Sequence, residues 1–240
     1  MMQTSMIVIP MRALGFALIL SSLCQAGAQS AKDPYPAMAP IAQYMMDRDA
    51  EIALARSAAP ASISDNAEVM VLGPQGYTTA VKGTNGFLCI VERGWAADTG
   101  NSDFWNPKLR GPLCLNPQAA KSYEPIYLLR TKLILAGKSK SEMLAATDAA
   151  FASNELSALE PGAMCYMLSK QQYLGDGPKR WHPHLMFFVA GDASKTWGAN
   201  QPGTPVMAAN FPEEKATIFM VVVDKWSDGT PGPMDDMSSH

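Results

Sequence analysis

The stretch that decides the fold is residues 67–92, which read AEVMVLGPQGYTTAVKGTNGFLCIVE. It contains three runs rich in β-branched, aromatic and other apolar residues, namely 67–72, 77–82 and 87–92. Gly and Pro lie between the first two runs, and Asn-Gly lies between the second and third. These residues supply the fixed or positive φ angles that tight turns need, so the spacing predicts an antiparallel meander of three strands.

Helical patterns flank this meander. Upstream, residues 40–57 have apolar side chains near the helical period, with Pro40 at a first helical position and Pro60 as a barrier to continuation. Downstream, residues 94–116 lose all periodicity and predict a long surface loop. Asn116-Pro117 then opens a helical region that Pro125 interrupts and that ends at Gly137.

A second central helix follows at once. Ser139-Lys140-Ser141-Glu142 has the form of a capping box, and the pattern continues to about Ser153. Three further strand-like runs come after it, at 163–168, 184–189 and 216–223. Because helices and strands do not alternate strictly, the sequence predicts an α+β fold. We expect one domain, residues 39–228, with a mostly antiparallel sheet of about six strands on which an N-terminal helix and a central helix pair are packed.

The first 28 residues have the layout of a secretory signal peptide. Arg12 precedes the apolar run 13–20, and the small residues Ala26-Gly27-Ala28 form a cleavage site. Translation starting at Met11 instead of Met1 would give the same mature chain. Residues 29–38 and 229–240 are rich in Pro, Ser, Gly and acidic residues and are expected to be flexible. The sequence therefore predicts a periplasmic or secreted protein.

Composition limits the partners. Without residues 1–28 the chain has 18 Lys and Arg against 22 Asp and Glu, a net charge of about −4, and no basic stripe for nucleic acid. The longest apolar run after the signal, residues 216–223, is too short to span a membrane. No sequence motif indicates a cofactor. The expected partner is a small molecule or a protein.

The cysteines predict one disulfide. Signal removal eliminates Cys24 and leaves Cys89, Cys114 and Cys165, an odd number, in an oxidising compartment. Cys89 and Cys114 are the preferred pair, because a flexible loop can bring Cys114 to the strand that contains Cys89. Cys165, in the apolar segment 164–168, is then a free thiol.

Two alternatives give Cys165 a chemical role. With His184 as its base it would be the nucleophile of a hydrolase, although a buried cysteine is more often an inert core residue. Alternatively, His182 and His184 lie two residues apart and would face the same way on an extended chain, so with Cys165 or Asp176 they could hold a metal ion. The neighbouring methionines, Met164, Met167 and Met186, would suit copper. Two histidines alone form only half of a site.

The tryptophans are candidates for ligand binding. All five lie at predicted loops or strand ends: Trp95, Trp105, Trp181, Trp197 and Trp226. Aromatic rings gathered there could line a pocket for a flat or sugar-like ligand, and otherwise each would close the end of the core. The candidate ligand-binding residues are Trp105, Trp181, His182, His184 and Trp197.

Three segments carry a resemblance. They resemble segments of exported bacterial proteins that have no assigned activity, and they are residues 51–55, residues 83–87 with Cys89, and residues 183–187. The resemblance supports export and implies no mechanism. Because no nucleophile and base pair can be placed by spacing, the sequence favours a non-enzymatic ligand-binding or interaction protein of the cell envelope over an enzyme.

Overall fold

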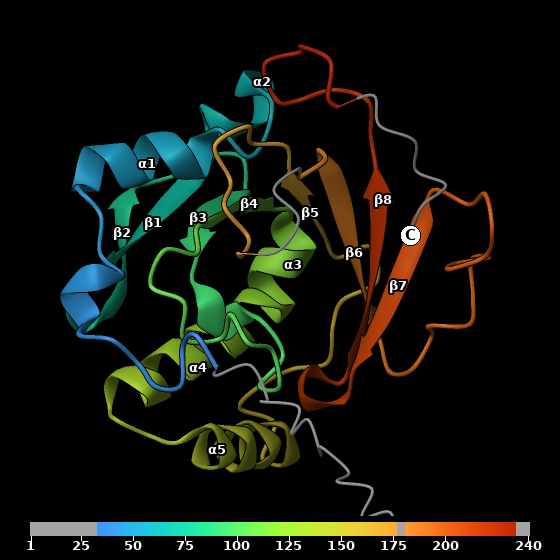
Figure 1. Cartoon of the computed structure of the whole chain (residues 1–240). Helices are drawn as coiled ribbons and strands as arrows, with labels where there is room; N and C mark the ends of the chain where they lie inside the picture. The colour runs from blue at the N-terminus through green and yellow to red at the C-terminus, as the bar shows by residue number, and fades with distance from the viewer. Residues whose placement is uncertain (1–32, 177–180, 234–240) are drawn as a thin grey trace, which may run out of the picture. The chain divides into compact units, whose positions relative to one another are not determined.

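The computed structural model describes residues 33–176 and 181–233 (Figure 1). These residues form an eight-stranded sheet with helices on both faces. The strands are β1 Glu68–Gly73, β2 Gly76–Val81, β3 Leu88–Glu92, β4 Gly111–Leu115, β5 Met164–Met167, β6 His184–Ala190, β7 Val206–Phe211 and β8 Ala216–Val222. The α-helices are α1 Arg48–Arg56, α2 Ala61–Ser64, α3 Pro117–Ser122, α4 Glu124–Leu135 and α5 Lys140–Ala152, and the 3₁₀ helices are η1 Ile41–Gln43, η2 Gly94–Ala96 and η3 Pro212–Glu214. The α+β prediction is confirmed, but the sheet has eight strands instead of about six.

The sheet is mixed. Its strand order is β2-β1-β3-β4-β5-β6-β8-β7, and β1 and β3 run parallel while the other neighbours are antiparallel. The predicted meander is therefore wrong in its third strand, which pairs with β1 and not with β2. Burial explains this order: β3 is buried along its whole length and needs a neighbour on each side, whereas β2 exposes Thr78 and Thr79 and suits an edge.

Sequence patterns missed β4 and β7. Strand β4 lies inside the predicted loop and begins with Gly111 and Pro112, which read as turn residues. Its pairing with β5 covers only Cys114 and Leu115, so Pro112 has a strand neighbour on one edge, where the missing N–H is tolerated. Strand β7 contains Ala208, Ala209 and Asn210, which have low strand propensity.

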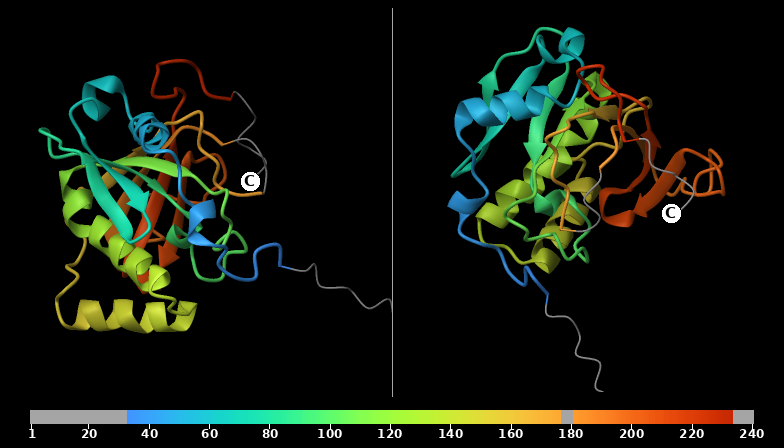
Figure 2. Two further views of the ribbon diagram at one scale, coloured as in Figure 1. Left: turned by 90° about the vertical axis from the view of Figure 1, so that its left-hand side faces the viewer. Right: turned by 45° about the horizontal axis from the view of Figure 1, so that its top comes forward.

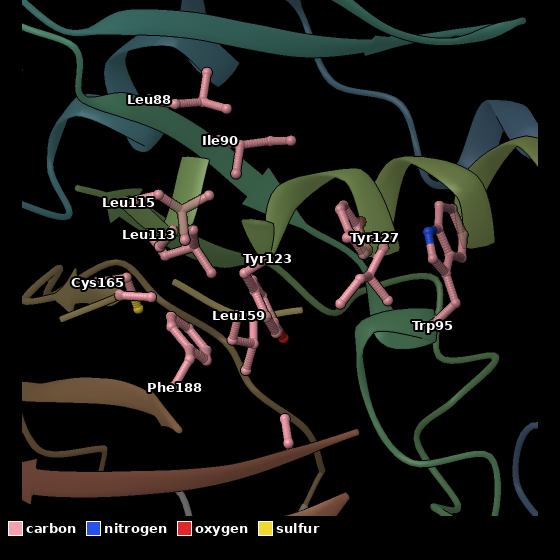
Figure 3. Packing of buried hydrophobic residues seen from close by; sticks show 14 of the residues in the cluster. Leu88, Ile90, Trp95, Leu113, Leu115, Tyr123, Tyr127, Leu159, Cys165 and Phe188 are labelled. Carbon is pink, nitrogen blue, oxygen red and sulfur yellow. The ribbon is translucent and has the colours of Figure 1, made fainter. Parts of the chain in front are cut away.

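Alternating side chains form two cores on opposite faces of the sheet. Helix α1 packs over β1, β3 and β4, and its Leu54 and Ala55 meet Val69 and Val91. On the other face, α3 and α4 cover a larger core that includes Ile90, Leu113, Tyr123, Cys165 and Phe188, whose side chains gather between α4 and the strands in Figure 3. Helix α5 lies against α4, as the two views in Figure 2 show from different sides.

The predicted N-terminal helix is split in two. The segment begins with η1, and α1 starts anew after Asp47. The carboxylate of Asp47 accepts hydrogen bonds from the backbone N–H groups of Asp49, at 3.0 Å, and Ala50, at 3.1 Å. Because an N-cap residue has extended backbone angles, the helix cannot continue through it.

The central helices agree with the prediction. The helical region after Asn116 is interrupted at Tyr123, just before Pro125, and gives α3 and α4. Gly137 has a φ of 76°, which a glycine adopts readily at a helix C-terminus. Ser139 and Glu142 form the capping box that opens α5.

A buried ion pair connects α1 to the end of β3. Arg93 Nη2 lies 2.8 Å from Glu51 Oε1, and both side chains are fully buried. The Arg93 guanidinium also donates to the carbonyl oxygens of Tyr44, at 2.7 Å, and Val91. The same Glu51 oxygen accepts the backbone N–H of Leu72 in β1 at 3.2 Å. The pair therefore joins η1, α1, β1 and β3.

Both ends of the chain continue beyond the described residues, which exclude the predicted signal peptide, 1–28. Part of the predicted C-terminal flexible segment is structured, because Lys225 and Pro231 form a β-bridge and Gly232 N–H donates to Asp224 O at 2.8 Å.

The outer edge of β7 is covered by Asn200. Its side-chain amide donates to Ala208 O at 2.8 Å and accepts from Ala208 N–H at 3.0 Å, while its own N–H donates to Val206 O at 2.9 Å.

The predicted disulfide is present. Cys89 and Cys114 are bonded, and Cys165 is free and buried. The geometry differs from the one expected, since Cys114 is not on a flexible loop. The two cysteines face each other across the adjacent strands β3 and β4.

Removing this disulfide should destabilise the protein. We expect the double variant Cys89→Ala and Cys114→Ala to lose about 3 kcal/mol of unfolding free energy, because the crosslink restricts the unfolded chain. Urea unfolding of the protein purified without reducing agent measures this loss, with Cys165→Ala as the variant that keeps the crosslink. Three reactive thiols in the denatured, unreduced wild-type protein would contradict the assignment.

Breaking the buried ion pair should cost more than breaking an exposed one. Arg93→Met leaves the Glu51 carboxylate buried without its cation, and we expect a loss of about 3–5 kcal/mol. Adding Glu51→Gln should recover part of it. Arg48→Met, which removes the exposed pair with Asp49, is the control and should change urea unfolding little. Equal losses in the two Arg variants would show that burial of the pair is irrelevant.

Candidate functional site

The tryptophans predicted to share a pocket are dispersed. Trp95 is fully buried, and its indole N–H donates to Thr131 Oγ1 at 2.9 Å. Trp105 is half-buried on the α3 and α4 side, edge-on to Phe104 with ring centroids 4.6 Å apart. Trp181 and Trp226 are also half-buried. The structure does not bring Trp105 and Trp197 together, because Trp197 lies on the opposite face of the sheet.

Trp197 is the exposed aromatic residue. Its side chain is 54% exposed, and no other large hydrophobic residue in 33–176 and 181–233 is exposed to this degree. The indole stacks on Phe219 of β8, with centroids 4.2 Å apart and planes at 17°, and meets the edge of Phe187 of β6 at 5.7 Å. One face of the indole therefore rests on the sheet while much of the ring remains in solvent.

The backbone of Trp197 is strained. Its φ of 59° lies in the left-handed region, which a bulky residue adopts rarely and at a cost of roughly 1–2 kcal/mol. The loop that holds it is fixed to β8 by the buried Thr217, whose hydroxyl accepts from Ala193 N–H at 2.7 Å and donates to Gly191 O at 2.8 Å. Strain maintained by such anchoring is typical of functional positions.

The two histidines have different roles. His184 is 3% exposed at the start of β6, and its Nδ1 lies 2.8 Å from the carbonyl oxygen of His182. A carbonyl only accepts, so Nδ1 carries the proton and Nε2 carries the lone pair. Nε2 is buried and has no hydrogen-bond partner. Burial lowers the pKa of His184, which keeps the ring neutral. His182 contributes its carbonyl to this arrangement.

Cys165 lies on β5, on the same face of the sheet as Met186 of β6, directly opposite it. The thiol is fully buried. Burial raises the pKa of Cys165 well above its usual range, and the nearby Glu92 adds to this shift. A protonated, inaccessible thiol is a poor nucleophile. The geometry therefore gives the hydrolase hypothesis no support.

The predicted metal ligands do not form a site for a divalent ion. Within the described ranges, no three His, Cys, Asp or Glu side chains are grouped so that they could hold a metal. This result concerns only His, Cys, Asp and Glu, and it does not include the thioether groups of methionine. Met186, Met220 and Met207 lie directly opposite one another on β6, β8 and β7, and form a row that continues from Cys165.

A cluster of buried carboxyl groups was not found from the sequence. Glu92 ends β3, and Glu214 of η3 accepts from Arg130 of α4 at 2.6 Å. Burial raises the pKa of Glu92 to about 8, with a further contribution from Glu214 and opposition from Arg130. Burial likewise raises the pKa of Glu214 to about 7, and Arg130 opposes this shift. Glu92 is therefore mostly protonated at neutral pH.

Glu124 belongs to the same region. It is buried at the start of α4, neither carboxyl oxygen has a partner, and burial raises its pKa well above the usual range. The available signal was positional: Glu92 follows four apolar residues of a strand, and Glu124 precedes a proline within an apolar helix. Because charged residues are usually exposed, such a position does not by itself predict a buried carboxyl group.

Two cavities lie away from the predicted residues. One, of about 310 Å³, is lined by Phe151, Asn154, Leu156, Ala158, Leu159, Ala190, Gly191, Glu214 and Lys215. The other, of about 230 Å³, is lined by Glu68, Gly83, Gly86, Phe87, Leu88 and Ala120. The first has Glu214 in its wall, but the free oxygen of this residue is buried. Asn154, Glu214 and Lys215 contribute polar groups to the first cavity and Glu68 to the second, but neither cavity contains a residue that the sequence predicted to bind a ligand.

Comparisons with protein-family models, curated proteins and solved structures gave no match. Among the described helices, none combines the length and apolar content needed to cross a membrane. Functional inference therefore depends on Trp197 on one face of the sheet and on the residues around His184 on the other.

The protonated carboxyl group of Glu92 should make stability depend on pH. The folded-state pKa of about 8 lies above the ordinary value of 4.5, so between these values only the folded chain keeps the proton. Stability must therefore fall as pH rises through this window, by a few kcal/mol at most. We expect urea unfolding at about pH 5 and pH 8 to show a smaller fall in Glu92→Gln than in wild type.

The exposed Glu155 provides the control for this measurement. Glu155→Gln should keep the pH dependence of the wild-type protein. Since other groups titrate in the same window, the quantity of interest is the difference between variant and wild type. Identical pH dependence in wild type and Glu92→Gln would disprove the role of Glu92.

Proposed function

We propose that the protein is a non-enzymatic binding protein exported to the cell envelope, and that it binds a flat or sugar-like ring on the exposed face of Trp197. The observation that carries the proposal is the strained backbone of Trp197, which holds its indole in solvent on top of Phe219. An indole face supported from below offers a large contact area at low entropic cost.

The surroundings of Trp197 favour a shallow binding surface. Leu185 and Phe187 of β6 and Val221 of β8 alternate onto the same face as Phe219 and are half-buried. Their apolar side chains extend the platform beyond the indole. A ring stacked on Trp197 would cover apolar surface that otherwise stays in contact with water.

Two observations support export and a non-catalytic role. The Cys89–Cys114 disulfide is compatible with an oxidising compartment, which the predicted signal peptide would reach. The buried thiol of Cys165 and the neutral His184 lack the access and the ionisation that thiol catalysis needs.

Replacing Trp197 should abolish binding with little loss of stability. Asn tolerates the left-handed backbone, so Trp197→Asn relieves strain while it removes the stacking on Phe219. We expect unfolding free energy to change by about 1 kcal/mol or less, because these effects oppose each other. Binding is measured by tryptophan fluorescence with N-acetylglucosamine oligosaccharides, glucose oligosaccharides and planar aromatic acids as probes.

Trp226→Phe is the matched control, since it removes a half-buried indole elsewhere and should leave binding unchanged. Two-dimensional NMR of the indole N–H groups identifies which tryptophan responds to a probe. The proposal fails if no probe shifts the Trp197 signal, or if Trp197→Asn binds like wild type.

A further inference from the structure

The face of the sheet opposite Trp197 carries an arrangement of soft metal ligands. His184 and Met186 lie two residues apart on β6, so their side chains are on the same face, roughly 7 Å apart along the strand. Met220 of β8 is directly opposite Met186, and side chains in such pairs begin roughly 5 Å apart. The side chains of His184, Met186 and Met220 therefore leave the same face of the sheet from three neighbouring positions.

The tautomer and the hydrogen bond of His184 are those typical of a metal-binding histidine. Its Nδ1–H donates to the His182 carbonyl, which fixes the ring and places the lone pair on Nε2. That nitrogen is buried without a partner, although most buried polar atoms are hydrogen-bonded. A metal ion would supply the missing interaction.

The ligand set selects the metal. Thioethers prefer Cu(I), whereas divalent ions such as zinc need additional nitrogen, thiolate or carboxylate ligands, and within the described residues no group of three such side chains exists. Met186 and Met220 are only half-buried, which gives an ion access from solvent.

The sulfur atoms of Met167 and Cys165 are also close to His184 and Met186 along the sheet, but the proposed site does not include them. The terminal methyl group of Met167 lies toward Gly111 in β4, on the side away from β6. Cys165 lies on β5, two strands away from Met220 of β8, so its thiol starts roughly 10 Å from that thioether.

We propose that His184, Met186 and Met220 form a Cu(I) site, with the imidazole Nε2 and the two thioether sulfurs as ligands. The site is independent of the proposed binding surface, since it lies on the other face of the sheet. It revises the metal hypothesis from the sequence, because His182 acts through its carbonyl and methionines replace Cys165.

Anaerobic titration of the full exported protein with Cu(I), in competition with a chromophoric chelator, tests this proposal. We expect one Cu(I) per chain. Met186→Leu and Met220→Leu keep the side-chain volume and remove the sulfur, so each should weaken binding by roughly tenfold or more, and together they should abolish it. Ag(I), which shares the ligand preference and does not change oxidation state, should follow the same order.

Three further variants separate the possible ligands. His184→Asn keeps an N–H for the His182 carbonyl and removes Nε2, so it should also lose binding. Met143→Leu, in the buried core at α5, and Cys165→Ala should both bind Cu(I) like wild type. If His184→Asn fails to fold, the two Met→Leu variants still decide the outcome.

X-ray absorption of the Cu(I) protein should show one nitrogen and two sulfur ligands. Absence of stoichiometric binding would overturn the proposal. So would wild-type affinity in both Met→Leu variants, or loss of binding in Cys165→Ala alone.

Discussion

The constraint on which the structure depends is the complete burial of Arg93. A buried guanidinium is tolerated only when its donors are satisfied and its charge is paired. Glu51 supplies the charge, and the carbonyl groups of Tyr44 and Val91 accept two further hydrogen bonds. These partners come from η1, α1 and the end of β3, so the segment before the sheet cannot move from it without leaving a charge uncompensated.

Two different surfaces coexist on one sheet because the helices cover its two halves unequally. Helices α1, α3 and α4 cover the half of the sheet that contains β1, β3 and β4. The half formed by β6, β8 and β7 has fewer covering helices, and there the side chains remain partly exposed. Strand alternation then presents aromatic residues around Trp197 on one face and the row of methionines on the other. A single strand, β6, contributes Phe187 to the first and Met186 to the second.

The sequence predicted correctly those elements that a few adjacent residues determine. The capping box at Ser139, the glycine at position 137 and the hairpin turn before Tyr77 depend on a few adjacent residues. Strand pairing is not local: β3 lies beside β1 because of its burial. The disulfide was predicted from redox context, although the assumed loop is a strand. The protonated Glu92 was missed because its pKa results from burial that only the folded chain creates, whereas the loop position of Trp197 was evident and its exposure was not.

The hydrogen bonds of Asn200 occupy part of the outer edge of β7. An unpaired strand edge offers donors and acceptors to any other extended chain, which makes it a template for filament growth. Here one side-chain amide takes both bonding groups of Ala208, as a neighbouring peptide unit would, and the backbone N–H of Asn200 takes the carbonyl of Val206. The loop that presents Trp197 on the sheet thus also occupies bonding groups of Val206 and Ala208 at this edge. Another extended chain would have to displace Asn200 before it could pair with β7 at Val206 and Ala208.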